Sequence, residues 1–118
     1  MTDEEDRLRA AAQMLATIHD ALRRDLAAAR RDPRVHCLAF CSALGAHHRN
    51  EDAVFPRVEA AFPEAAPLLR RLRAEHERIA RQIEEQPDAD TLELMAAELE
   101  EHFALEEREL VPLISRLR

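Results

Sequence analysis

The chain has 118 residues, a length that suits one domain with a modest hydrophobic core. Its net charge of −7 argues against a surface that binds nucleic-acid phosphates. An acidic start and no apolar run approaching about 18 residues argue against a signal peptide and a membrane span, so we expect a cytoplasmic protein.

The first predicted helix spans about residues 3–31. A single glycine and many Ala, Leu, Glu and Arg residues favour helix throughout the chain. Thr2 and Glu5 have the spacing of a capping box at the start of this helix. Its apolar stripe contains one histidine and consists of Leu8, Ala12, Leu15, His19, Leu22 and Leu26.

The second predicted helix spans about residues 33–61. Asp32 is placed to cap it, and Pro33 suits its first position because that position needs no N–H donor. The sequence Phe62-Pro63-Glu64 ends it. Its buried face is predicted to carry Cys37, Phe40, Leu44, His47, Glu51, Phe55 and Val58.

Two further helices are predicted at about 64–86 and 91–116, with a loop at 86–90 between them. Asp90 and Glu93 have capping spacing at the start of the last helix, and Pro112 is predicted to bend its last turns. The stripe of the third helix is Leu69, Leu72, His76, Ile79 and Ile83. The stripe of the fourth is Leu92, Met95, Leu99, His102, Glu106, Leu110 and Leu113.

Four amphipathic helices joined by short loops predict an all-α fold, an antiparallel up-down-up-down four-helix bundle formed by residues 1–118 as a single domain. Three of the four stripe histidines lie about 12 residues from a helix end, which is about 18 Å at the rise of an α-helix. The fourth, His47, lies at the matching level of the second helix. We therefore expect all four histidines in one layer of the bundle.

These histidines predict a metal site. One histidine on an apolar stripe is more often a packed core residue than a ligand, but four at one depth are not explained by packing. Two of them open the same i,i+4 pair, His47-x-x-x-Glu51 and His102-x-x-x-Glu106, which places imidazole and carboxylate on one helix face. Such groups are costly to bury without a partner. The predicted metal ligands are His19, His47, Glu51, His76, His102 and Glu106.

The ligand types restrict the metal. Imidazole and carboxylate without thiolate favour iron or manganese, with zinc as an alternative. Six ligands are too many for one tetrahedral zinc ion, but they suit two six-coordinate ions that share carboxylates. The Glu-x-x-His signature of ferritin-like di-iron proteins is absent, which excludes that family. The residues three before the four histidines are Ala16, Leu44, Arg73 and Leu99.

Other candidates are weaker. His48 lies 100° around the helix from His47, so it is predicted to point at a flank or at solvent, and His36 is predicted at the surface or the core edge. Glu107 could substitute for Glu106 as a ligand at a poorer angle, and either His48 or Glu107 could assist at the site. Cys37 and Cys41 are predicted to be small buried hydrophobes, since one helical turn cannot easily hold a disulfide. Core packing is predicted for Leu15, Phe40, Leu44, Phe55, Leu72, Met95, Phe103 and Leu110.

The order His, HxxxE, His, HxxxE on four helices resembles the hemerythrin (HHE cation-binding) family over nearly the whole chain. The flanks agree, with Phe55-Pro56 after the first HxxxE and Leu110 and Pro112 after the second. The resemblance implies two iron ions with a bridging oxo or hydroxo group. It implies that His19 and His47 hold one iron, that His76 and His102 hold the other, and that Glu51 and Glu106 bridge them.

The chain departs from the oxygen-carrying members of this family on the third helix. Those members have HxxxH there, whereas Leu72 and Ala80 lie four residues either side of His76. They also have an aspartate five residues after the histidine of the fourth helix, where this chain offers Glu106 at four or Glu107 at five. The chain is similar to the bacterial short form with a single third-helix histidine, which implies one iron with a vacancy or a water.

The resemblance implies a protein that binds or turns over O₂, H₂O₂ or NO, with peroxidase- or catalase-like activity as one form of this function. A vacancy at one iron favours turnover over reversible oxygen storage. The alternatives are a non-catalytic module for oxygen or iron sensing or metal storage, and a purely structural bundle. The expected partner is a small-molecule ligand, with no nucleic acid and no membrane, and the expected state is a monomer or a weak homo-oligomer.

Overall fold

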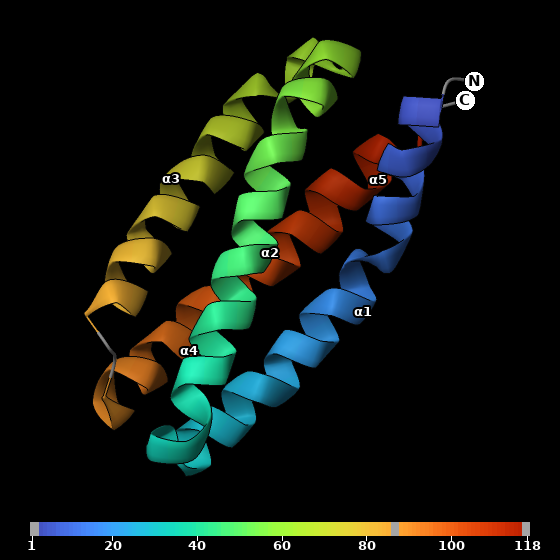
Figure 1. The fold of residues 1–118 in the computed structure, drawn as a ribbon. Coiled ribbons are helices and arrows are strands. Elements are labelled where there is room, and N and C mark those ends of the chain that lie inside the picture. The colour runs from blue at the N-terminus through green and yellow to red at the C-terminus, as the bar shows by residue number, and fades with distance from the viewer. Residues whose placement is uncertain (1–2, 86–87, 117–118) are drawn as a thin grey trace.

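The computed structural model describes residues 3–85 and 88–116. Its elements are α1 (Asp3–Arg31), α2 (Pro33–Ala61), the 3-10 turn η1 (Pro63–Ala65), α3 (Ala66–Glu84), α4 (Ala89–Leu105), the π-helical segment η2 (Glu106–Leu110) and α5 (Val111–Ile114). Figure 1 shows that each long helix runs opposite to the one before it, so the start of α1 and α5 lie at the same end of the molecule. The described part of the chain holds helices and no strand, which confirms the predicted all-α four-helix bundle.

The helix ends follow local capping chemistry. Asp32 occupies the N-cap of α2 as predicted, although in the described structure its side chain makes no capping hydrogen bond. At α4 the prediction was wrong, because the cap is Asp88 and not Asp90. The Asp88 side chain accepts a hydrogen bond of 2.8 Å from the Thr91 backbone N–H, three residues later, which is the geometry of an N-cap.

Two sequence predictions at chain ends and loops lie outside the described residues. These are the capping role of Thr2 and the loop conformation of residues 86 and 87. The remaining part of the predicted loop is corrected, since Ala89 and Asp90 already belong to α4. The third predicted helix is also shorter than expected, because η1 forms its first turn and α3 ends at Glu84.

The last helix changes geometry directly before Pro112. Glu106–Leu110 is π-helical, and the Val111 N–H donates to the carbonyl of Glu106, five residues earlier. Proline has no N–H, and its ring crowds the carbonyl four residues earlier, so a regular α-helix cannot continue through Pro112 without loss. A π turn is a common solution, and such turns occur frequently at functional sites.

The hydrophobic core is divided into two clusters. The first contains Leu22, Leu26, Ala29, Phe40, Cys41, Leu44, Ile79, Leu92, Met95, Leu99 and Phe103. The second contains Leu8, Ala12, Phe55, Val58, Ala65, Leu69, Leu72, Leu105, Leu110 and Ile114. On α1, α2 and α3 a buried histidine lies between the members of the two clusters. On the last helix the clusters meet between Phe103 and Leu105, and the buried His102 and Glu106 flank this boundary. A polar layer therefore separates the two apolar halves of the bundle.

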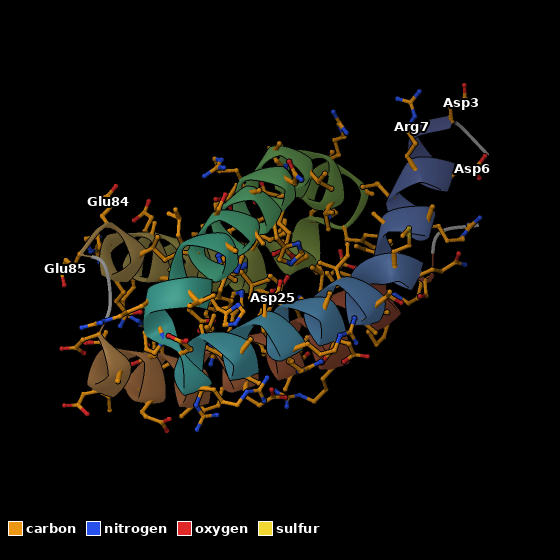
Figure 2. All side chains as sticks on the ribbon, turned by 60° about the horizontal axis from the view of Figure 1, so that its bottom comes forward. Asp3, Asp6, Arg7, Asp25, Glu84 and Glu85 are labelled. Carbon is orange, nitrogen blue, oxygen red and sulfur yellow. The ribbon has the colours of Figure 1, made fainter. Side chains whose placement is uncertain are left out.

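Charged side chains cover the outside. Figure 2 shows the side chains of Arg7, Glu84 and Glu85 projecting away from the ends of the bundle. None of the helices in the described ranges combines the length and the apolar character that crossing a bilayer requires.

Candidate metal centre

The polar layer brings together the six side chains that the sequence singles out. They are His19 from α1, His47 and Glu51 from α2, His76 from α3, His102 from α4 and Glu106 at the start of η2. Glu106 is fully buried at 0% exposure, and the Glu51 side chain keeps 9% of its surface exposed. Four helices thus deliver imidazoles and carboxylates to one interior layer.

The four imidazoles form two pairs that face each other through their Nε2 atoms. The Nε2 atoms of His19 and His47 are 3.3 Å apart, and those of His76 and His102 are 3.1 Å apart. Two imidazole nitrogens that bind one metal ion at about 2.1 Å and at right angles are about 3 Å apart. Each pair therefore has the spacing that two neighbouring ligands of one ion require.

The two carboxylates connect these pairs, since each lies beside one histidine of either pair. The Nε2–Oε1 distances are 3.1 Å for His47–Glu51, 3.5 Å for His76–Glu51, 2.7 Å for His102–Glu106 and 3.8 Å for His19–Glu106. A carboxylate in this position can offer one oxygen to each of two ions.

A second set of carboxylates holds the opposite side of the rings. The Nδ1 of His76 donates a hydrogen bond of 2.8 Å to Asp52 Oδ1, and the Nδ1 of His102 donates one of 2.7 Å to Glu75 Oε1. Burial raises the pKa of Glu75, but the hydrogen bonds from His102 and Arg71 outweigh it and lower this pKa, so the group is an ionised acceptor.

These outer bonds fix the tautomers. With the proton on Nδ1, the Nε2 atoms of His76 and His102 both present lone pairs to each other at 3.1 Å. Two facing lone pairs repel unless a cation lies between them. Metal-ligating histidines commonly show this arrangement, with one nitrogen toward the ion and the other bonded to a carboxylate.

His19 is oriented from its outer side by Glu107. The Nδ1 of His19 lies 3.4 Å from Glu107 Oε1. Arg23 donates hydrogen bonds of 3.1 and 2.9 Å to the two oxygens of Glu107, and these bonds lower the pKa of Glu107. The Phe103 ring stacks on His19 with centroids 4.3 Å apart. Glu107 thus lies beside the outer nitrogen of His19, whereas Glu106 lies beside its inner nitrogen.

Burial and the neighbouring ionisable groups shift the pKa values of the inner side chains. Burial, followed by the neighbouring His47, lowers the pKa of His19 to about 4, so this imidazole is neutral. Burial raises the pKa of Glu51, but Glu106 and His47 outweigh it and lower this pKa to about 2. Burial and the adjacent Glu51 carboxylate raise the pKa of Glu106 well above its usual value. One of the two inner carboxylates is therefore ionised and the other holds a proton.

Several buried polar atoms of the layer are left without hydrogen bonds. Among the described residues, they are His48 Nε2, Glu51 Oε1, both oxygens of Glu106 and the outer Nδ1 of His19. Unpaired polar atoms in an interior are rare and costly. A cation bound by the Glu51 and Glu106 oxygens would remove the cost for these atoms, so the donor set fits a metal.

His48 is a correction to the sequence analysis. It was predicted to face a flank or solvent, but it is only 5% exposed, and its ring stacks on His76 with centroids 4.0 Å apart. The cause is the width of the buried face of α2, which packs against both α1 and α3. Phe40 and Cys41, seven residues earlier, are likewise two adjacent buried positions.

The other minor predictions hold in part. His36 is exposed at the start of α2, and Cys41 is buried as predicted, whereas Cys37 is only half-buried. Neither cysteine forms a disulfide in the described ranges. Their Sγ atoms are 3.7 Å apart, and burial followed by the Cys37 hydrogen bond raises the pKa of Cys41 to about 12, so this thiol stays protonated. All eight residues predicted as core packing are buried: Leu15, Phe40, Leu44, Phe55, Leu72, Met95, Phe103 and Leu110.

Of the outer carboxylates, Asp52 and Glu75 were not predicted, and Glu107 was predicted only as a substitute ligand or an assisting group. The sequence carries a signal for all three, because each is the direct neighbour of a candidate ligand in the chain: Asp52 follows Glu51, Glu75 precedes His76 and Glu107 follows Glu106. An acidic residue directly beside a candidate ligand on three helices is the pattern that could have identified them.

Two openings reach the centre from different sides. A groove of about 910 Å³ between α2 and α3 is lined by Cys37, Cys41, Gly45, His48 and His76, among others. A smaller pocket of about 200 Å³ between α1, α2 and the last helix reaches His47 and Glu51 past Leu15, Val54 and Phe55. The wide groove therefore leads to the pair of His76 and His102, and the narrow apolar pocket leads to the pair of His19 and His47.

Comparisons with known proteins give one match. A family model described as the hemerythrin HHE cation binding domain matches residues 1–114. Searches of curated proteins and of solved structures found no match.

Proposed function

This chain belongs to the hemerythrin HHE cation binding domain family, and we propose that its buried centre holds two iron ions and that the protein binds or turns over a small oxidant, O₂, H₂O₂ or NO. A cation-binding domain with a buried His/Glu cluster accounts for the metal. Iron is favoured because the domain family implies it and because imidazole and carboxylate ligands without thiolate suit it. Four such ligands per ion would leave open positions on a six-coordinate ion but none on tetrahedral zinc.

The observation that carries this proposal is the pairing of the imidazoles across two shared carboxylates. In the proposed centre His19 and His47 would hold one ion, His76 and His102 would hold the other, and Glu51 and Glu106 would serve both. An oxo or hydroxo group would complete the set of ligands. The support is that each Nε2 pair has ligand spacing, at 3.3 and 3.1 Å, and that each carboxylate contacts one histidine of either pair.

Bound iron would supply the electrons and the open coordination positions that an oxidant needs. The chain supplies the rest. Asp52 and Glu75 keep the proton of their histidines on Nδ1, so that Nε2 stays a donor of electron pairs. Glu106 releases its carboxyl proton when a cation arrives, because metal binding requires the ionised carboxylate.

The walls of the small pocket select the ligand. Leu15, Val54 and Phe55 line the route to His47 and Glu51 with apolar surface. Such a route admits small neutral molecules more readily than hydrated ions. Diatomic gases and peroxide fit this description, which supports a small-molecule ligand rather than a macromolecular partner.

The experiment is anaerobic titration of metal-free protein with ferrous iron, followed by O₂, peroxide or NO. We expect two ions per chain, near-ultraviolet charge-transfer bands after oxidation, and turnover with peroxide. His76→Ala should remove both the bands and the turnover. The chain has no Trp and no Tyr, so its own near-ultraviolet absorbance is small and the bands are easily seen.

The matched control is His36→Ala, which removes an exposed histidine from the same helix that carries His47. This variant should keep the stoichiometry and the spectrum. The proposal fails if unsupplemented and iron-treated protein both lack bound metal and unfold at the same temperature. If metal binds and peroxide is not consumed, the non-catalytic sensing or storage alternative is favoured.

A further inference from the structure

His48 is a buried imidazole whose Nε2 atom is left without a hydrogen bond by the side chains around it. It is 5% exposed, and its Nε2 has no hydrogen-bond partner among the residues that the structure describes. The ring stacks on His76, with an interplanar angle of 12°, and meets His102 edge-on at 5.1 Å between centroids. It therefore lies against the histidine pair of α3 and α4 and turns a bare nitrogen into the interior.

The ligand-type atoms of the centre divide into two unequal groups. In the first group, one donor atom each from His48, Glu51, His76 and His102 lie within 4.8 Å of one another. The second group, defined in the same way, contains His19, His47 and Glu106. The first group thus holds three imidazoles and a carboxylate, and the second holds two imidazoles and a carboxylate.

We propose that His48 is a metal ligand and gives the ion held by His76 and His102 a third imidazole. This inference rests on the proposed two-ion centre and changes its composition. The family resemblance implied an iron with one histidine fewer, because Leu72 and Ala80 lie four residues either side of His76 on α3. The missing imidazole is instead supplied by α2, from the position next to His47.

The adjacency of His47 and His48 explains how one helix can serve both ions. Neighbouring residues on an α-helix point about 100° apart, and α2 packs between α1 and α3. The Nε2 of His47 lies 3.3 Å from His19 on α1, whereas the ring of His48 lies against His76 on α3. His47 therefore belongs with His19, and the adjacent His48 lies with His76 and His102.

Stacking alone is the competing explanation, and it makes a different prediction. If His48 only packs against His76, a phenyl ring at position 48 should serve as well. If His48 binds metal, a phenyl ring should fail, because it keeps the stacking surface and offers no nitrogen. His48→Phe is therefore the decisive variant, and His36→Phe is its matched control on the same helix.

The test measures cobalt(II) and iron(II) binding to each variant by competition with a chromophoric chelator. Wild type and His36→Phe should bind two ions per chain. In His48→Phe the affinity for one of the two ions should fall at least as far as the roughly 10- to 100-fold caused by loss of an outer partner. The visible spectrum of the cobalt protein should change at the same site. Unchanged affinity and spectrum in a helical, cooperatively unfolding His48→Phe overturn the proposal.

A second variant tests the same point without a bulky ring. His48 lines the wide groove, so His48→Ala opens a space that small molecules can enter from solvent. Imidazole should restore the lost affinity and spectrum in this variant, and pyrrole, which has the same shape and no basic nitrogen, should not. Equal rescue by both molecules overturns the proposal. If wild type itself binds fewer than two ions, the two-ion centre fails, which is distinguishable from a failure of His48 alone.

Discussion

Arg23 acts on the centre through a carboxylate and not by direct contact. It donates hydrogen bonds to Asp20, Glu100 and Glu107, and of these three carboxylates Glu107 is the one in contact with a ring nitrogen of His19 in the described structure. An outer group of this kind orients a ligand and makes it more basic. Its removal should therefore weaken metal binding while the inner residues stay in place.

We expect Arg23→Gln to lower metal affinity by about 10-fold, at the low end of the range for outer partners, because Arg23 is one step removed from the imidazole. Arg30→Gln is the matched control, since Arg30 bonds Glu93 across the same pair of helices, α1 and α4, at 2.8 Å. Chelator competition compares the two variants. Equal affinities would show that the Arg23 contact to Glu107 does not support His19.

At the scale of residues, the sequence could predict which side chains meet in the layer, but not which neighbouring groups orient them. The helical period places His19, His47, His76 and His102 on one stripe each, and similar distances from the helix ends set their common depth. The partners of the outer nitrogens depend on the rotation of neighbouring helices, which no single-helix pattern contains. For this reason Asp52, Glu75 and the inward turn of His48 were missed.

At the scale of elements, the start of α4 separates two capping residues that look alike in sequence. Asp88 accepts the hydrogen bond from the Thr91 N–H, whereas Asp90 lies inside the first turn. We expect Asp88→Ala to lower the melting temperature by about 2–8 °C, as the loss of an N-cap does in a domain of this size. Thermal unfolding followed by circular dichroism measures the change.

Asp90→Ala is the matched control two residues later. It removes an exposed carboxylate near the same helix end, so only the weaker interaction with the helix dipole is lost. Its melting temperature should stay closer to that of wild type. The reverse order of the two variants would show that Asp90 is the cap after all.

Helix boundaries were predictable where local chemistry decides them. Asp32 and Pro33 mark the start of α2 because a capping residue and a proline suit the same place. The π-helical turn at Glu106–Leu110 was not predictable, since a 3.6-residue period assumes a regular helix. Pro112 predicted a distortion there, but it did not predict that the distortion is a π-helical turn.

At the scale of the whole molecule, the polar layer makes the metal-free protein sensitive to acid. The pKa of His19 is lowered to about 4 and that of His48 to about 2, in both cases chiefly by burial. The unfolded chain takes up these protons near pH 6.5, whereas the folded chain does not. Stability from these groups is therefore present above about pH 6.5 and is lost as the pH falls toward the folded values.

Glu106 works in the opposite direction, because its raised pKa stabilises the folded state at low pH and this contribution is lost as the pH rises through the folded value. Below the unfolded pKa of 4.5, the contribution of Glu106 to stability no longer changes with pH. Glu51, whose pKa is lowered in the folded state, begins to lose its stabilising contribution as the pH falls below this value. We expect the melting temperature of chelator-treated protein to fall below about pH 6.5 and most steeply below about pH 4.5. A melting temperature that is constant between about pH 7 and about pH 4 would contradict this. His48→Phe removes one titrating group and should flatten the profile.

The arrangement of the bundle was predictable because the apolar stripes, the helix-start signals and the loop lengths all indicate the same topology. Four stripes, two proline-marked helix starts and short connections leave little choice of topology. What the pattern could not show is that the apolar core is divided. Stripe positions above and below the histidines look alike in sequence, and only the contacts assign Leu22 and Leu99 to one half and Leu8 and Leu69 to the other.

The set of carboxylates at the centre has a consequence for electron transfer. Five acidic side chains touch the histidines: Glu51, Asp52, Glu75, Glu106 and Glu107. When all are ionised they carry five negative charges. Two ferrous ions would leave this group with one surplus negative charge, and two ferric ions with the proposed oxo bridge would leave it with the same charge, because the oxide adds two negative charges. Loss of two electrons together with formation of the bridge would therefore leave the net charge of the buried layer unchanged.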